Sequence, residues 1–121
     1  MSQQQIDLDD FDQFRERMHE RIQDEGNLQI NRFFSLDNQA YRDGALDVKT
    51  KELLGLVSSM VLRCDDCITF HLMNAVEEGA TDDELFETFN VALVIGGSIV
   101  IPHLRRVVDT LDRLRGRAGS E

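Results

Sequence analysis

The sequence has no tryptophan, one proline and two cysteines, and it is short of positive charge. Lysine and arginine together number 13, against 23 aspartates and glutamates, which leaves a formal net charge of -10. A protein of this sign repels phosphate backbones and anionic lipid surfaces. We therefore expect neither a nucleic acid nor a membrane as partner.

A long hydrophobic run is also absent. The longest predominantly apolar segment covers residues 91–101, whereas a helix needs about 20 residues to cross a bilayer. The first residues lack the basic start and apolar stretch of a signal peptide. We therefore expect a cytoplasmic protein, in which both thiols are reduced by default.

What the sequence does contain is helical periodicity. Apolar residues recur at helical spacing over residues 8–22, and further helices are expected over about 28–41, from 47, from 82 and up to 114. No segment shows the alternation typical of a strand. With 121 residues, 41% of them hydrophobic, the chain predicts a single all-α domain over residues 1–121, a compact bundle of about five to six helices.

Several residues predict where these helices begin and end. Asp47 is the expected N-cap of the third helix, and Gly79 the C-cap of the fourth. Thr81 with Glu84 forms the capping-box pattern. The segment "VALVIGGSIVI" is interrupted by two glycines and is apolar on every side. Such a segment must be covered all round, which predicts a homo-oligomer.

Both cysteines and one histidine lie in "VLRCDDCITFHL", residues 61–72. On one helix, at about 100° per residue, Cys67 and His71 fall at about 300° and 340° from Cys64, so all three share a face. Cys67 and His71 are one turn apart, so the imidazole can take the thiol proton. The intervening aspartates oppose a thiolate but suit a first helical turn, which predicts that Cys64 starts a helix.

Other interpretations of the cysteine pair stay open at this point. The pair could bind zinc with His71 and either His103 or His19 as further ligands. It could form a structural disulfide, although a disulfide that closes so short a loop stabilises the protein little. The cysteines could also be ordinary core residues. No phosphate-binding glycine loop is present, since "GGSIV" lacks the required spacing. The prediction includes no cofactor and assigns no metal ligand.

One spacing resembles a known active-site motif. Glu52, Cys64, Cys67 and His71 are separated by eleven, two and three residues, as in the alkylhydroperoxidase D branch of the carboxymuconolactone decarboxylase family. Residues 45–100 are similar to that family along their length. The resemblance implies an alkylhydroperoxidase D-like helical fold that assembles into trimers or hexamers.

The resemblance also implies a role for each residue. Glu52 and His71 would form a proton relay, Cys67 would attack a peroxide and become a sulfenic acid, and Cys64 would supply a proton and close the disulfide. An unbroken helix would place Glu52 about 18 Å from Cys64, still further from His71. The helix is therefore expected to break near residues 62–65.

The sequence thus predicts a thiol-dependent hydroperoxidase or disulfide oxidoreductase with an antioxidant role. Its substrate would be a hydroperoxide or a partner's disulfide, and its electrons would come from a dithiol donor. Asp66 departs from the motif, because the alkylhydroperoxidases proper often have histidine there. Two alternatives are a carboxymuconolactone decarboxylase-like lyase, which would not need the cysteine pair, and a non-catalytic oligomeric or zinc-binding module.

Overall fold

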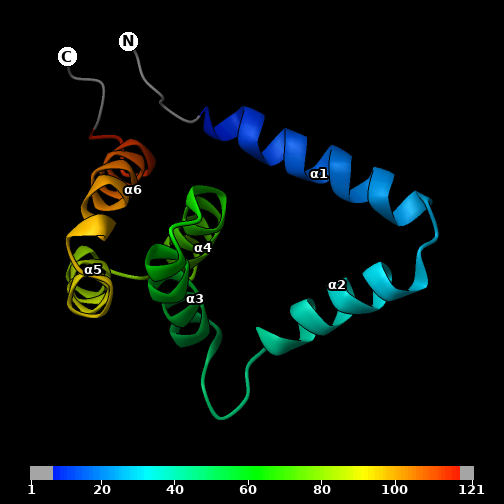
Figure 1. Cartoon of the computed structure of the whole chain (residues 1–121), viewed down its shortest axis with the longest axis horizontal. Helices are drawn as coiled ribbons and strands as arrows, with labels where there is room; N and C mark the ends of the chain where they lie inside the picture. Colours follow the sequence, from blue (N-terminus) through cyan, green and yellow to red (C-terminus); the bar gives the residue numbers. More distant parts are fainter. Residues whose placement is uncertain (1–6, 118–121) are drawn as a thin grey trace. The chain divides into compact units, whose positions relative to one another are not determined.

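The computed structural model describes residues 7–117, which form helices joined by turns and contain no strand (Figure 1). The all-α prediction is confirmed. The elements are α1 (Leu8–Asp24), α2 (Leu28–Ala40), α3 (Val48–Leu62), α4 (Asp65–Glu77), α5 (Asp82–Gly96), the short 3-10 helix η1 (Ser98–Val100) and α6 (Ile101–Leu114). None of the helices in residues 7–117 is both long and apolar enough to span a bilayer.

The predicted N-caps are confirmed, and the C-cap of α4 is Glu78, one residue before the predicted Gly79. The Asp47 carboxylate accepts a hydrogen bond from the backbone N–H of Thr50 and so caps α3. Thr81 and Glu84 form a complete capping box at the start of α5. Gly79, just past the end of α4, has a φ of 91°, a conformation that glycine adopts without steric cost. Local sequence therefore sets these boundaries.

The chain divides into two compact units, Met1–Arg42 and Asp43–Glu121. The first contains the helices α1 and α2, neither of which has a buried residue. His19 of α1 packs against Phe34 of α2 with 4.6 Å between ring centroids. The single domain over residues 1–121 stays a prediction.

The buried core lies in the second unit, where α3 packs against α4 and α5, and α4 packs against α6. Its largest fully buried side chains are Phe89, Leu56, Met60, Leu72, Leu85, Leu111, Val100 and Val107. Helix α6 buries Val107 and Leu111, as its apolar spacing predicts. The pairing of α3 with α4 places these two helices side by side, and both carry candidate site residues.

The chain breaks between α3 and α4, as the distance argument requires. Arg63 has a φ of 61°, in the left-handed region. Its backbone N–H and that of Cys64 donate to the carbonyls of Met60 and Ser59, both at 3.1 Å, which closes the end of α3. The chain then turns back, and α4 begins at Asp65. The predicted break at residues 62–65 is confirmed.

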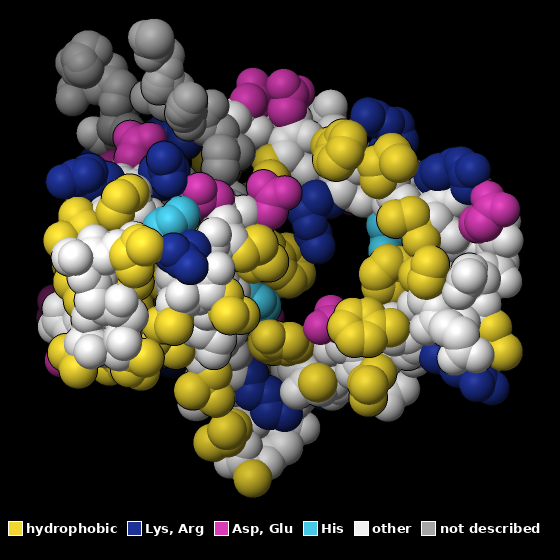
Figure 2. All heavy atoms as spheres, viewed as in Figure 1, with side chains coloured by type: hydrophobic (Ala, Val, Ile, Leu, Met, Phe, Trp, Pro, Cys, Tyr) yellow, Lys and Arg dark blue, Asp and Glu magenta, His cyan; other side chains and the backbone are white. Residues whose placement is uncertain are grey.

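A second break follows α5, where Gly97 has a φ of 82° and Pro102 lies in the first turn of α6. Around this break several apolar side chains are exposed, above all Val94, which is 86% exposed. Figure 2 shows hydrophobic side chains at the surface in this part of the second unit. The other exposed members are Val91, Ile95 and Ile99.

Candidate active site

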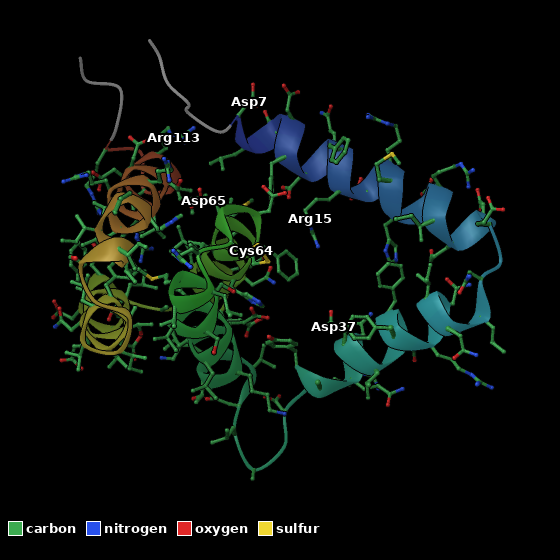
Figure 3. The ribbon with its side chains drawn as sticks, in the orientation of Figure 1. Asp7, Arg15, Asp37, Cys64, Asp65 and Arg113 are labelled. Atoms are coloured by element: carbon green, nitrogen blue, oxygen red, sulfur yellow. A yellow bond between two sulfur atoms is a disulfide. The ribbon has the colours of Figure 1, made fainter. Side chains whose placement is uncertain are left out.

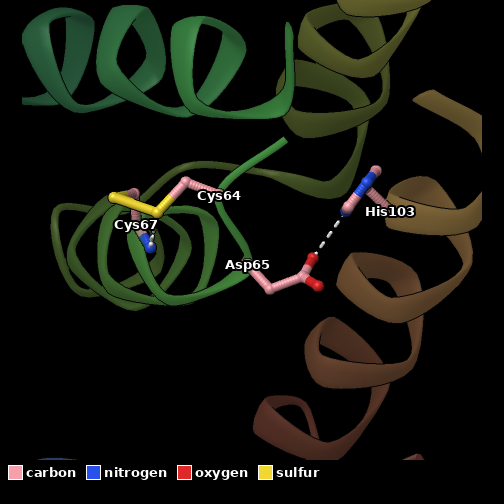
Figure 4. The surroundings of a disulfide bond; sticks show 4 residues. All are labelled: Cys64, Asp65, Cys67 and His103. Carbon is pink, nitrogen blue, oxygen red and sulfur yellow. Dashed lines mark hydrogen bonds and ion pairs between the residues drawn. A yellow bond between two sulfur atoms is a disulfide. The ribbon is translucent and has the colours of Figure 1, made fainter. Parts of the chain in front are cut away.

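Cys64 and Cys67 are joined by a disulfide at the start of α4 (Figure 4). Cys64 is the N-cap residue, and its sulfur accepts a hydrogen bond from the backbone N–H of Cys67 at 3.3 Å. The prediction that Cys64 starts a helix is confirmed. Their Cα atoms are 5.3 Å apart, a normal distance for a disulfide. The pair is in the disulfide form here, one of the two forms that the redox prediction requires, whereas the reduced form was expected by default.

The helix start also favours a thiolate once the pair is reduced. The first turn of a helix has backbone N–H groups without helical partners, and these and the helix dipole stabilise negative charge. Asp65 and Asp66 occupy the same turn and oppose a thiolate. The reactivity of the pair therefore depends on how these two carboxylates are held.

His71 pairs with Glu52 across the two helices. The imidazole Nδ1 lies 2.8 Å from the Glu52 Oε1, and the side chains of the two residues are 12% and 7% exposed. A carboxylate can only accept, so Nδ1–H donates and Nε2 becomes the acceptor nitrogen of the neutral ring. The distance argument required the two helices to bring these groups together, and they do so.

Two further residues hold this pair in place. The Asn74 side-chain amide donates to the second carboxylate oxygen of Glu52 at 3.4 Å. Gly55 lies against the imidazole so closely that a Cβ there would come within 2.7 to 2.9 Å of three ring atoms of His71. Sequence reasoning missed both. The available signal was spacing, since Gly55 follows Glu52 by one helical turn and Asn74 follows His71 likewise.

The structure joins the four predicted residues in two pairs, one through a hydrogen bond and one through a disulfide. Glu52 bonds to His71, and Cys64 bonds to Cys67. The pairs are connected through α4, where His71 follows Cys67 by one turn and lies on the same side of the helix. Their catalytic roles stay a prediction.

His103, which the sequence offered as a possible zinc ligand, contacts the end of α4 at which the disulfide lies. Its Nδ1 lies 2.8 Å from Asp65 Oδ1, and Arg106 Nη1 lies 3.2 Å from Asp65 Oδ2. Both partners come from α6. Figure 3 shows Asp65 and Cys64 together at this end of α4. The spacing of 38 residues between Asp65 and His103 explains why no local pattern indicated the contact.

Within residues 7–117, no group of three or more histidine, cysteine, aspartate or glutamate side chains is placed to hold a metal ion. The two sulfurs are bonded to each other, and a metal would need them as thiolates. His103 is engaged with Asp65.

Comparisons with known proteins agree with this fold. A protein of known structure from Thermotoga maritima is 57% identical over 88% of this chain and 94% of its own, with a TM-score of 0.86. Another structure of the Thermotoga protein has a description that suggests a role in the antioxidative response. The apo form of a Legionella pneumophila carboxymuconolactone decarboxylase family protein is 31% identical over 91% of this chain and 98% of its own, with a TM-score of 0.69.

A Paracoccus denitrificans protein, "Uncharacterized protein 4 in cox locus", is 32% identical over 84 residues, which are 69% of this chain and 76% of that protein. Residues 30–110 match the carboxymuconolactone decarboxylase family. This range contains Glu52, both cysteines and His71. The chain therefore belongs to the carboxymuconolactone decarboxylase family.

Proposed function

We propose that the protein is a thiol-dependent hydroperoxidase that also acts as a disulfide oxidoreductase. One observation carries the proposal: a Cys64–Cys67 disulfide starts the same helix on which His71 bonds to the buried Glu52. A redox-active pair, a base and a residue that orients the base are the parts that thiol catalysis requires. The description of the Thermotoga protein supports an antioxidant role.

In the reduced enzyme, Glu52 would orient the imidazole and stabilise its positive charge. His71 would then take the proton of Cys67 through Nε2, which increases the fraction of reactive thiolate. The Glu52 side chain suits this role because it is 7% exposed and bonds to His71 at 2.8 Å. A buried carboxylate of this kind stabilises an imidazolium more than a solvated one does.

The oxidative step would consume one hydroperoxide. The Cys67 thiolate attacks the terminal oxygen of the peroxide, the O–O bond breaks, and the alcohol leaves with the proton held by His71. Cys67 is then a sulfenic acid. The Cys64 sulfur attacks it, water leaves with the Cys64 proton, and the disulfide forms. The peroxide gains two electrons and the two cysteines lose them.

The reductive step would return the pair to the dithiol. A dithiol donor attacks the disulfide and forms a mixed disulfide, and its second thiol then releases the reduced enzyme. The same exchange, run in the other direction, would let the reduced pair reduce a partner's disulfide. Cys67 is exposed, so a donor can approach it.

The lyase alternative explains less of this site. Decarboxylation of a carboxylated lactone needs no pair of cysteines, and such an enzyme would gain nothing from a disulfide at the start of α4. The residues that the family resemblance assigns to thiol chemistry are all present and bonded in pairs. We therefore keep the lyase as an outcome of the test.

The test is hydroperoxide consumption with a small dithiol as the electron donor. The parent should consume peroxide in proportion to the amount of dithiol that is oxidised, and Cys67→Ser should abolish turnover. Ser58→Ala, an exposed position of α3, is the control and should keep the parent rate. Equal rates of peroxide consumption in the parent and in Cys67→Ser would contradict the proposed function. Decarboxylation of a carboxylated lactone by both proteins would favour the lyase.

A further inference from the structure

Asp65 poses an electrostatic problem for a redox pair. It directly follows Cys64 and is the first residue of α4. A negative charge beside a thiol disfavours the thiolate and raises the thiol pKa. An unpaired carboxylate at this position would therefore work against the reaction proposed above.

Helix α6 resolves the problem by holding both oxygens of Asp65. His103 Nδ1 donates to Oδ1 at 2.8 Å, and Arg106 donates to Oδ2 at 3.2 Å. The His103 side chain is 15% exposed and the Asp65 side chain is 37% exposed, so the bond is shielded from water mainly on the His103 side. Figure 4 shows the Asp65 carboxylate turned towards His103, on the side away from the two sulfurs.

We propose that His103 and Arg106 are positioning residues for the redox pair, which hold the Asp65 carboxylate away from the sulfurs and offset its charge. This inference rests on the proposed thiol redox function. It assigns to α6 a part in tuning that reaction, although α6 carries none of the four motif residues.

The electrostatic effect acts on the reduced state. When oxidised glutathione oxidises the dithiol, the two cysteines lose two electrons and two protons, and glutathione disulfide becomes two glutathione thiols. The protein disulfide is uncharged, whereas the reduced pair contains thiolate. A contact that stabilises the thiolate therefore favours the reduced form and makes the pair a stronger oxidant.

Two variants change the charges at this contact in opposite directions. Arg106→Gln leaves the Asp65 charge less compensated, which should raise the thiol pKa and favour the disulfide. Asp65→Asn removes that charge and retains an oxygen that can accept from His103, which should lower the thiol pKa and favour the dithiol. A purely structural role would predict that both variants shift the equilibrium in the same direction.

His103 offers a rescue test of the same contact. His103→Ala removes the donor and should shift the equilibrium towards the disulfide, as Arg106→Gln does. His103→Gln retains an N–H that can donate to Asp65, so its equilibrium constant should lie nearer that of the parent. Thermal unfolding of each variant separates a loss of folding from a change in redox equilibrium.

The experiment measures the equilibrium between the protein and glutathione redox buffers, together with thiol alkylation at graded pH. We expect Arg106→Gln and Asp65→Asn to shift the equilibrium constant about threefold or more in opposite directions, which corresponds to about 14 mV each. Arg105→Gln is the matched control, since it removes an exposed arginine from the adjacent position of α6 and should leave the constant unchanged.

The outcomes separate this inference from the function on which it rests. Suppose that the parent exchanges with glutathione. The proposed role of α6 is then wrong if the equilibrium constants of Arg106→Gln and Asp65→Asn shift in the same direction, or if they shift no more than that of Arg105→Gln. If the parent does not exchange with glutathione at all, the thiol redox function fails, and this inference fails with it.

Discussion

His71 of α4 bonds to Glu52 of α3 at 2.8 Å, although 19 residues separate them in the sequence. The contact exists because Arg63 ends α3 in a left-handed conformation and the chain folds back into α4. The carboxylate side chain is 7% exposed and its second oxygen accepts from Asn74. A buried carboxylate with two partners is held in one orientation, which suits a role in orienting the imidazole.

We predict that Glu52→Gln lowers the rate of hydroperoxide reduction by about 100-fold, the usual size of an acid–base contribution. Glutamine fills the same volume and retains an oxygen that can accept from Nδ1–H, but it has no charge to stabilise the imidazolium. The measurement is steady-state peroxide consumption with a dithiol donor, with helix content followed by circular dichroism.

The control for this variant is Glu77→Gln, which removes an exposed carboxylate from the last turn of α4. Its rate should equal that of the parent. A folded Glu52→Gln protein with the parent rate would show that the Glu52–His71 bond is structural only.

Gly55 gives a second test of the same pair. Alanine in a helix is favoured over glycine by about 1 kcal/mol, so Gly55→Ala in the middle of α3 would ordinarily stabilise the protein. Here the added Cβ would come within 2.7 Å of His71 Cε1, and such overpacking costs about 1–3 kcal/mol. We predict that the imidazole shifts and that activity falls about tenfold or more, with a lower midpoint of thermal unfolding.

The matched control is Gly44→Ala. A Cβ there would lie 3.6 Å from Lys51 Nζ, an ordinary contact, so its activity should equal that of the parent. Parent-like activity in Gly55→Ala would mean that the imidazole can move without loss of function.

How far the sequence predicts this structure depends on the range of the interactions involved. The caps at Asp47 and Thr81 were predictable because each rests on residues three apart. The break near Arg63 followed from the length of a helix. Fold class and helix positions depend on the same local patterns, and the structure agrees with them.

The site was predictable only through its resemblance to a family motif. Glu52 stands between lysine and leucine, and without that motif its sequence context indicates a solvated surface carboxylate. The contacts between Asp65 and His103, and between Glu52 and Asn74, join different helices. Such contacts depend on how helices pack, and single-helix periodicity contains no information about the partner.

Glu84 provides a prediction about pH and stability. Hydrogen bonds, first from the Thr81 backbone and then from Lys49, hold the pKa of Glu84 below its ordinary value of 4.5. A lowered folded-state pKa contributes stability above the unfolded pKa, and this stability is lost as the pH falls through the folded pKa. We predict that Glu84→Gln unfolds at a lower temperature than the parent near neutral pH.

The difference in unfolding temperature between the parent and Glu84→Gln should shrink as the pH falls below 4.5, because protonated Glu84 and glutamine are then alike in charge. The measurement is thermal unfolding of both proteins across this range. Glu87→Gln, at an exposed position of α5, should have the unfolding temperature of the parent at every pH. A difference between parent and Glu84→Gln that does not change with pH would rule out an electrostatic origin.

The exposed apolar residues after the middle of α5 predict assembly of the chain. Val94 is 86% exposed and Ile95 65% exposed, and burial of such a side chain is worth about 1.5–3 kcal/mol. Val94→Glu would place a charge in a buried interface, so we predict a shift from an oligomer towards the monomer. Size-exclusion chromatography with light scattering measures the mass directly. Ser58→Glu adds the same charge at an exposed position of α3 and should keep the parent mass. A monomeric parent would contradict the homo-oligomer prediction, because the exposed valine would then have no partner copy to cover it.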